Sequence, residues 1–138
     1  SAWGAHTWPD SLDIMGWRIT DDGFGVLFAR DSPSLVAREL RPVLANVLAG
    51  LGLARRDVGA WACHPGGAKV VAALEETLAL PPGSLDVVLA VLRDHGNMSA
   101  ATLLYVLERR LARPLPARMA ALALGPGFTA GFVMLEAP

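Results

Sequence analysis

The stretch "VGAWACHPGG", residues 58–67, joins a short apolar run to a Pro-Gly-Gly break. An apolar run of this length, bounded by turn residues, is typical of a buried strand, and the sequence after Gly66 repeats apolar residues at helical spacing. We therefore predict a strand from Val58 to Cys63 that ends at His64 and leads directly into a helix. This step from buried strand to helix indicates an α/β layered domain.

On the N-terminal side of this stretch, the sequence predicts a hairpin followed by a long helix. Residues 1–13 show no period and are predicted to be a loop or an extended segment. Residues 14–29 contain two β-leaning runs around Asp-Asp-Gly, which is a hairpin signal. Apolar residues then recur at helical spacing from Val36 to Leu51, with Pro42 inside the pattern. Because proline lacks an N–H group, we expect the helix to be kinked or divided there.

On the C-terminal side, three helices and two closing strands are predicted. Ser84 follows a Pro-Pro-Gly break and is expected to cap the second helix. The apolar runs 119–124 and 128–137 are expected to be strands joined by a tight turn. The residues expected to face inward on the three helices are Val70, Leu74, Leu78, Leu85, Val88, Leu89, Leu92, Leu104, Leu107 and Leu111. Together these elements predict one α/β domain over residues 1–138.

Composition narrows the class of protein. The chain has 12 Lys and Arg against 13 Asp and Glu, so no strong field directs it to nucleic acid or an anionic membrane surface. No apolar run is long enough to span a bilayer, no signal-peptide pattern is visible, and the single cysteine is consistent with the cytoplasm. The hydrophobic share of 53% is high for a soluble domain. We therefore expect part of the surface to be buried against another protein surface.

The thiol of Cys63 and the imidazole of His64 look like a nucleophile beside its base. Neighbouring side chains of a strand point to opposite faces, so the thiol is predicted to point away from the imidazole and to behave as a small hydrophobe. Pro65 holds His64 extended, while Gly66 and Gly67 leave room for a ligand beside the ring. His64 is therefore a candidate site residue. The alternative is a buried histidine that is hydrogen-bonded within the core.

A second motif, "HGNMSAAT" at residues 95–102, places Asn97 just before a predicted helix. Asparagine in this position is commonly a helix cap. Ser99 could cap instead, which would free the Asn97 amide to donate to an oxyanion. His95 and His6 are predicted to be exposed.

A third motif, "LGPGFT" at residues 124–129, is compatible with a plain hairpin when taken alone. No metal-ligand spacing connects the three histidines with the cysteine or the carboxylates, so no metal centre is predicted.

Taken together and in this order, the three motifs resemble the C-terminal half of the type III polyketide synthases, the chalcone-synthase-like family. The likeness covers most of the chain, including "MGWRITDDGFGVLFARDSPSLV" upstream of the histidine, and the ending "LALGPGFTAGFVMLEA" resembles bacterial members. The ketoacyl synthase of fatty-acid initiation is a related alternative that also uses Cys, His and Asn. Its sequence after the histidine differs from Pro-Gly-Gly, so it ranks second.

The resemblance implies half of a thiolase-type fold, with a layered mixed sheet and packed helices. It also implies a Cys–His–Asn triad for decarboxylative condensation of an acyl-CoA starter with malonyl-CoA, in which His64 and Asn97 match the family's histidine and asparagine. The positions matched to substrate-binding elements are Gly66 and Gly67 near the CoA tunnel, Gly125, Pro126 and Gly127 in a cavity-shaping loop, and Val26 at a gatekeeping position.

One departure from the family is large, because its nucleophilic cysteine belongs to an N-terminal half that this chain lacks, and Cys63 does not match it. The resemblance therefore implies a C-terminal domain that is inactive alone and partners an N-terminal domain within a homodimer. It implies CoA thioesters as substrates and no cofactor. A non-catalytic interaction module that kept this half-fold is a further alternative, and it would need a polar outer surface where the other half once docked.

Overall fold

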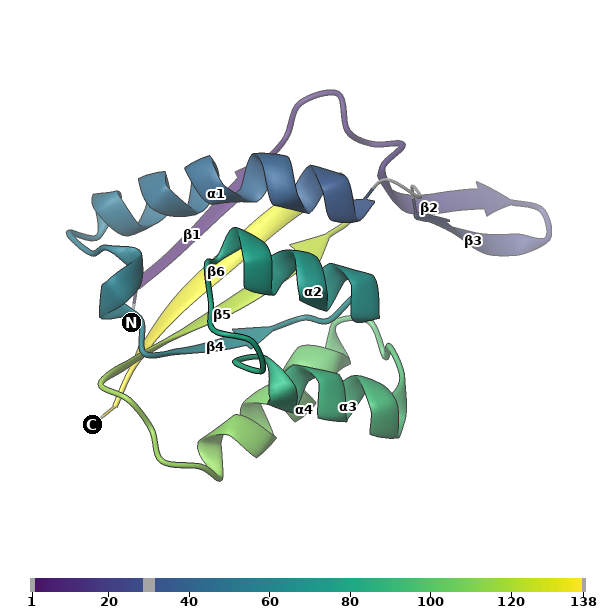
Figure 1. Ribbon diagram of the computed structural model, residues 1–138. Coiled ribbons are helices and arrows are strands. Elements are labelled where there is room, and N and C mark those ends of the chain that lie inside the picture. Colours follow the sequence, from purple (N-terminus) through teal and green to yellow (C-terminus); the bar gives the residue numbers. More distant parts are fainter. Residues whose placement is uncertain (1, 29–31, 138) are drawn as a thin grey trace.

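A four-stranded mixed sheet forms the centre of the computed structural model, which describes residues 2–28 and 32–137 (Figure 1). The two strands at one edge, β4 and β5, are parallel, and the β5–β6 and β6–β1 pairs are antiparallel. In the order in which they lie across the sheet, the strands are β1 (Ala2–Thr7), β6 (Thr129–Glu136), β5 (Arg118–Gly125) and β4 (Ala60–Cys63). The prediction of a layered α/β domain with a mixed sheet is confirmed.

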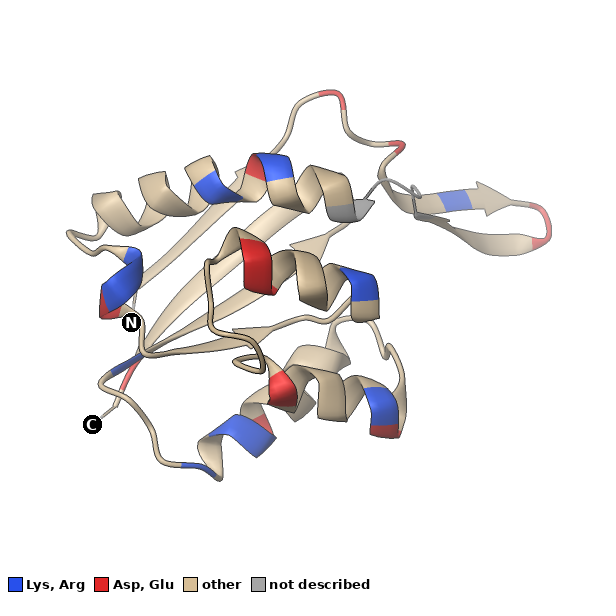
Figure 2. Cartoon of the chain, in the orientation of Figure 1, with Lys and Arg blue, Asp and Glu red and all other residues tan. Residues whose placement is uncertain are grey.

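The described residues also form four helices, which pack on this sheet or on one another. The helices α1 (Ser32–Gly50) and α2 (Ala68–Thr77) lie side by side on one face of it (Figure 1). The helix α4 (Ala101–Leu111) packs against β4, and α3 (Asp86–His95) packs against α4 and α2. A 3-10 turn, Arg55–Asp57, precedes β4. Figure 2 shows acidic and basic residues interspersed along the helices and loops.

The long helix α1 is not divided at Pro42, which excludes one of the two outcomes expected there, a kink or a division. The helix runs without interruption from Ser32 to Gly50, and Pro42 lies on its exposed side. The opposite side presents a buried stripe at helical spacing, formed by Val36, Leu40, Leu44 and Leu48. Packing of this stripe on the sheet supplies the stability that the lost backbone hydrogen bond removes.

The inward face of α4 differs from the predicted one. Leu104 and Leu111 are exposed, at 65% and 55%, whereas Thr102 and Val106 are fully buried. On α3, Leu89 is also exposed. Leu107, the third leucine predicted to face inward, is partly buried against the core, so leucine spacing was right for Leu107 and wrong for Leu104 and Leu111.

The start of α3 is also stabilised differently from the prediction. Ser84 does not cap this helix, since its hydroxyl donates to the carbonyl of Pro81 at 2.7 Å. A carboxylate oxygen of Glu75, on the neighbouring helix α2, instead accepts the N–H of Leu85 at 3.0 Å. The contact from Glu75 on α2 thus supplies the acceptor that was expected from Ser84.

A two-stranded hairpin, β2 (Met15–Thr20) and β3 (Gly23–Phe28), projects from the body of the domain (Figure 1). It confirms the predicted hairpin, except that Ala29 lies outside the described residues. Of the two histidines predicted to be exposed, His95 is exposed. The prediction for His6 was wrong, because it is half-buried in β1 with its ring 4.7 Å from that of Trp8.

Candidate active site

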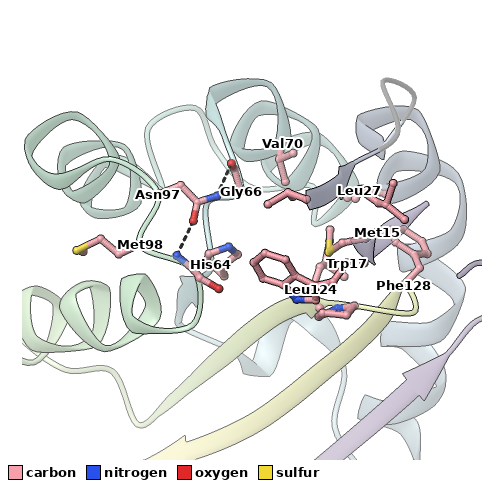
Figure 3. Close-up of a pocket in the computed structure, with 16 residues that line it drawn as sticks. Met15, Trp17, Leu27, His64, Gly66, Val70, Asn97, Met98, Leu124 and Phe128 are labelled. Carbon is pink, nitrogen blue, oxygen red and sulfur yellow. Dashed lines mark hydrogen bonds between the residues drawn. The ribbon is translucent and has the colours of Figure 1, made fainter. Parts of the chain in front are cut away.

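A cavity of about 400 Å³ lies where β4, the hairpin and the loop before α4 meet (Figure 3). Of the residues singled out from the sequence, those that line it are Val26, His64, Gly66, Asn97, Gly125 and Pro126. Gly67 and Gly127 do not line it. Most of the remaining wall is apolar, and its members include Met15, Trp17, Leu27, Val70, Leu124 and Phe128.

His64 is placed at the cavity by the sheet itself. Its backbone N–H donates to the carbonyl of Leu122 in β5 at 2.8 Å, which extends the β4–β5 ladder one residue beyond Cys63. The preceding side chain, Cys63, is fully buried in the core. Burial raises the pKa of its thiol to about 12, so the thiol stays protonated and unreactive near neutral pH. The prediction that Cys63 is a buried hydrophobe is confirmed.

The imidazole of His64 is partly buried, and this burial lowers its pKa. A lowered pKa favours the neutral ring near pH 7, which carries one N–H donor and one acceptor nitrogen. The Nδ1 atom is buried and has no hydrogen-bond partner among residues 2–28 and 32–137. A core histidine satisfied by its neighbours would have such a partner, so the structure does not support that alternative reading of His64.

The side-chain amide of Asn97 is held in one orientation by two hydrogen bonds. Its Nδ2 donates to the carbonyl oxygen of Gly66 at 2.9 Å, and its Oδ1 accepts the backbone N–H of Ser99 at 2.8 Å (Figure 3). Turning the amide over would place a donor against the Ser99 N–H and an acceptor against the Gly66 carbonyl. An asparagine amide has two N–H groups, and the second is not used in either of these bonds. Asn97 therefore retains one donor for a ligand.

Neither Asn97 nor Ser99 caps α4, so both of the capping alternatives considered from the sequence are wrong. The residue at the cap position of α4 is Ala100, and it makes no side-chain capping bond. Ser99 has a positive φ of 58° and offers its own N–H to Asn97. Asn97 thus orders the turn and keeps a free donor at the same time, as the Asx-type turn permits.

Gly66 takes part through its backbone. Its φ is +59°, in the region that favours glycine, and its carbonyl accepts the Asn97 amide. This one bond joins the first motif to the second. Gly67 lies outside the cavity wall as the residue that precedes α2.

The Gly-Pro-Gly turn is tied to the base of the hairpin. The N–H of Gly127 donates to the carbonyl of Met15 at 2.8 Å, and its carbonyl accepts the hydroxyl of Ser11 at 3.0 Å. Gly125 and Pro126 line the cavity, and Phe128, which is buried, forms part of its wall. The turn is therefore a structural junction as well as a cavity wall.

Val26 lies at the cavity mouth on the hairpin, where it pairs across the strands with Trp17. Both side chains are exposed. Sequence reasoning missed Trp17 and Met15 in β2 and Phe128 in the turn before β6 as wall residues, because an apolar residue carries no signal of whether it faces a core or a cavity. Sequence reasoning also missed the role of Ser11, a buried serine whose hydroxyl holds the carbonyl of Gly127.

No group of three or more His, Cys, Asp or Glu side chains that could hold a metal ion occurs within the described residues. In the same part of the chain, none of the helices is long and apolar enough to cross a membrane.

Comparison with known proteins identifies this arrangement. A family model described as chalcone and stilbene synthases, C-terminal domain, matches residues 4–137. The chain belongs to the chalcone and stilbene synthase family. The match to this C-terminal domain extends over almost the whole chain, well beyond the three motifs.

Relatives of this chalcone and stilbene synthase domain include bacterial enzymes. The 1,3,6,8-tetrahydroxynaphthalene synthase of Streptomyces peucetius subsp. caesius is 44% identical over 134 residues, which is 95% of this chain and 36% of that protein. The 3,5-dihydroxyphenylacetyl-CoA synthase of Streptomyces toyocaensis is 33% identical over 126 residues, or 88% of this chain and 32% of that protein. The chain spans about a third of the length of these two relatives.

Solved structures show the same fold for this domain. A type III pentaketide synthase from Neurospora crassa aligns with a TM-score of 0.88 at 26% identity and covers 100% of this chain and 40% of that one. A fungal type III polyketide synthase aligns with a TM-score of 0.85 at 27% identity over 99% of this chain and 40% of its own. The half-fold of thiolase type that the sequence implied is confirmed.

Proposed function

We propose that this chain is the C-terminal part of a type III polyketide synthase, an acyltransferase that condenses an acyl-CoA starter with malonyl-CoA. His64 and Asn97 are its catalytic donors, and the nucleophilic cysteine comes from an N-terminal domain. The observation that carries the proposal is that the imidazole of His64 and the oriented amide of Asn97 line one cavity.

The first half of the reaction loads the starter. The thiolate of the N-terminal cysteine attacks the thioester carbonyl, the bond from that carbon to the CoA sulfur breaks, and the CoA thiolate leaves and takes up a proton. The neutral imidazole of His64 takes the proton of that thiol, the resulting imidazolium stabilises the thiolate, and the same proton then passes to the departing CoA thiolate, which leaves the ring neutral again. Cys63 cannot replace this nucleophile, because its thiol is buried and its pKa is raised to about 12.

The second half extends the chain. Malonyl-CoA loses carbon dioxide, and the electron pair of the broken C–C bond passes to the α-carbon and the thioester oxygen. Donors from the neutral imidazole of His64 and the unused N–H of Asn97 stabilise the negative charge on that oxygen. The carbanion then attacks the acyl carbonyl, and the cysteine thiolate leaves.

The apolar wall suits the growing product. A mostly apolar cavity with a few converging polar groups is typical of small-molecule sites. Gly125 and Pro126 shape one side, and Val26 with Trp17 shapes the mouth. Gly66 contributes its carbonyl, and Gly67 directly precedes the helix beside the CoA tunnel. The substrates are CoA thioesters, and the proposed chemistry needs no resident cofactor.

Exposed apolar side chains support a missing partner domain. Trp3 on β1 and Leu104 and Leu111 on α4 are exposed at 76%, 65% and 55%. A stand-alone interaction module would need a polar outer surface, so these residues favour docking against an N-terminal domain and, in the complete enzyme, a homodimer. We place that enzyme in the cytoplasm, where the free thiol of Cys63 would stay reduced.

Activity of the full-length protein tests the proposal. With malonyl-CoA and an acyl-CoA starter, His64→Ala and Asn97→Ala should each lower kcat by about 100-fold or more, as expected when an oxyanion donor is removed. Cys63→Ala should retain condensation, and the 138-residue chain alone should give no product. Wild-type turnover by His64→Ala would refute the assignment. Preference for malonyl groups on acyl-carrier protein over malonyl-CoA would favour the ketoacyl synthase alternative.

A further inference from the structure

The loop that carries Asn97 lacks the usual local anchor. Residues 96–100 lead into α4, and Ala100 at the cap position makes no side-chain bond. The first N–H groups of a helix and of the loop before it need acceptors, which a cap commonly supplies. Here the acceptor comes from inside the first turn of the helix. The Oγ1 of Thr102 accepts the N–H of Met98 at 2.8 Å.

This hydroxyl acts on the peptide unit of Asn97 itself. The Asn97–Met98 peptide bond is planar, so the N–H of Met98 shares one rigid plane with the Cα and carbonyl of Asn97. A hydrogen bond to that N–H therefore fixes the plane from which the Asn97 side chain projects. Thr102 is fully buried at 0% exposure, which places this anchor beyond competition from bulk water.

The Asn97 amide and its peptide plane are thus held from two sides. Gly66 and Ser99 fix the amide, at 2.9 and 2.8 Å, and Thr102 fixes the plane behind it. With both sets of bonds in place, the unused N–H of Asn97 keeps a single direction. Without the Thr102 hydroxyl, the Asn97–Met98 peptide plane can rotate. The Asn97 amide would then keep its bonds to Gly66 and Ser99 only if it moved together with that plane.

We propose that Thr102 is a positioning residue that aims the Asn97 amide into the cavity. The inference rests on the proposed function, in which Asn97 stabilises the thioester oxyanion. Thr102 touches no reacting atom and acts through the Asn97–Met98 peptide.

The chain offers a matched control. Thr77, at the end of α2, is also buried, at 5% exposure, but its Oγ1 has no hydrogen-bond partner among the described residues. Thr77→Val and Thr102→Val make the same isosteric change in a buried helical threonine. Only the second removes an acceptor from the Asn97 loop.

The variants are compared in the full-length protein by malonyl-CoA decarboxylation and by condensation, well below the unfolding temperature. Thr102→Val should lower kcat by about 10- to 100-fold, the effect of a displacement near 1 Å in a catalytic group, and leave KM within about twofold. Thr102→Ser, which keeps a hydroxyl, should recover most of the loss. Thr77→Val should match the wild type.

A double variant separates positioning from a general loss of structure. If Thr102 acts through Asn97, then adding Thr102→Val to Asn97→Ala should lower kcat no further than Asn97→Ala alone. A merely structural role would instead give a further, independent loss. Amide hydrogen exchange adds a readout without turnover, since the Met98 N–H should exchange at least about tenfold faster in Thr102→Val.

The outcomes also distinguish this inference from the proposed function. Wild-type kcat in Thr102→Val, with activity lost in Asn97→Ala, overturns the positioning role and leaves the proposed function intact. Wild-type activity in Asn97→Ala overturns both. If Thr102→Val does not fold, Thr102→Ser remains decisive, because a 10-fold or larger loss in a variant that keeps the hydroxyl would contradict the hydrogen-bond argument.

Discussion

The reactivity of Cys63 tests whether its side chain points into the core while the neighbouring His64 faces the cavity. The thiolate is the reactive form of cysteine, and burial raises the pKa of this thiol from 9.0 to about 12. At pH 8 roughly one exposed thiol in ten would then be a thiolate, against about one in ten thousand for Cys63. We predict that alkylation of the native protein is about a thousandfold slower than alkylation of the unfolded chain.

Intact-mass spectrometry after timed exposure to iodoacetamide measures both rates, with guanidinium chloride used to unfold the chain. The native rate should still rise about tenfold for each pH unit between 8 and 10, whereas the unfolded rate should level off near pH 9. Incubation with an acyl-CoA should leave Cys63 unacylated. Native alkylation within tenfold of the unfolded rate, or an acyl adduct on Cys63, would refute the assignment of this thiol to the core.

Three further predictions concern stability and are measured as shifts in urea midpoints. Gly59→Ala should destabilise the fold by about 1–3 kcal/mol, because the new Cβ would lie 2.5 Å from the Cβ of Pro116; an unchanged midpoint would contradict this close approach. Burial lowers the pKa of His64, so the folded state resists a proton that the unfolded chain accepts below about pH 6.5. The free energy of unfolding should therefore fall as the pH drops from 7 to 5, and the fall should be smaller in His64→Gln. An equal dependence of the urea midpoint on pH in both proteins would contradict this. The Arg113–Asp86 ion pair, at 2.9 Å, is exposed on both sides, so Asp86→Asn should change stability by less than about 1 kcal/mol, and a larger loss would show that solvent does not screen it.

The periodic parts of the fold could be predicted from the sequence. The hairpin 14–28, the strand that ends at Cys63 and the buried face of α2 all follow from patterns in which one side of the element meets the core. The buried side of helix α4 could not be predicted fully in this way, since Leu104 and Leu111 are exposed, Leu107 is only partly buried and Thr102 lies within. Leucine spacing alone does not distinguish a face that packs on this domain's own core from one that stays exposed on it, as Leu104 does.

The failures at helix ends have a different cause. Ser84 and Ser99 are good capping residues by type, yet neither caps its helix. The acceptors come from Glu75, ten residues earlier in the chain, and from Thr102, inside the helix. Capping preferences by residue type register neither partner, since Glu75 is in place only once α2 and the start of α3 have packed together, and Thr102 lies beyond the cap position, four residues after Met98.

The candidate site could be predicted in its side chains but not in its backbone. His64 and Asn97 stand out by residue type and setting, and both line the cavity. The carbonyl of Gly66, which orients the amide, has no sequence signature, since every residue carries a carbonyl. Only the +59° φ of Gly66, a conformation that favours glycine, hints at why this position is special.

The bond from Asn97 to Gly66 explains why the two motifs occur together in one domain. The His-Pro-Gly-Gly turn holds the imidazole through the β4–β5 ladder, and the same turn supplies the acceptor that fixes the amide. A change in either motif would therefore disturb the other, although 31 residues separate the two partners of this bond. Under the proposed function, both donors are positioned within this domain before any nucleophile arrives, which is the preorganisation that oxyanion stabilisation requires. In that proposal the N-terminal domain would have to supply only a sulfur at the right place, and it would not need to assemble the donors.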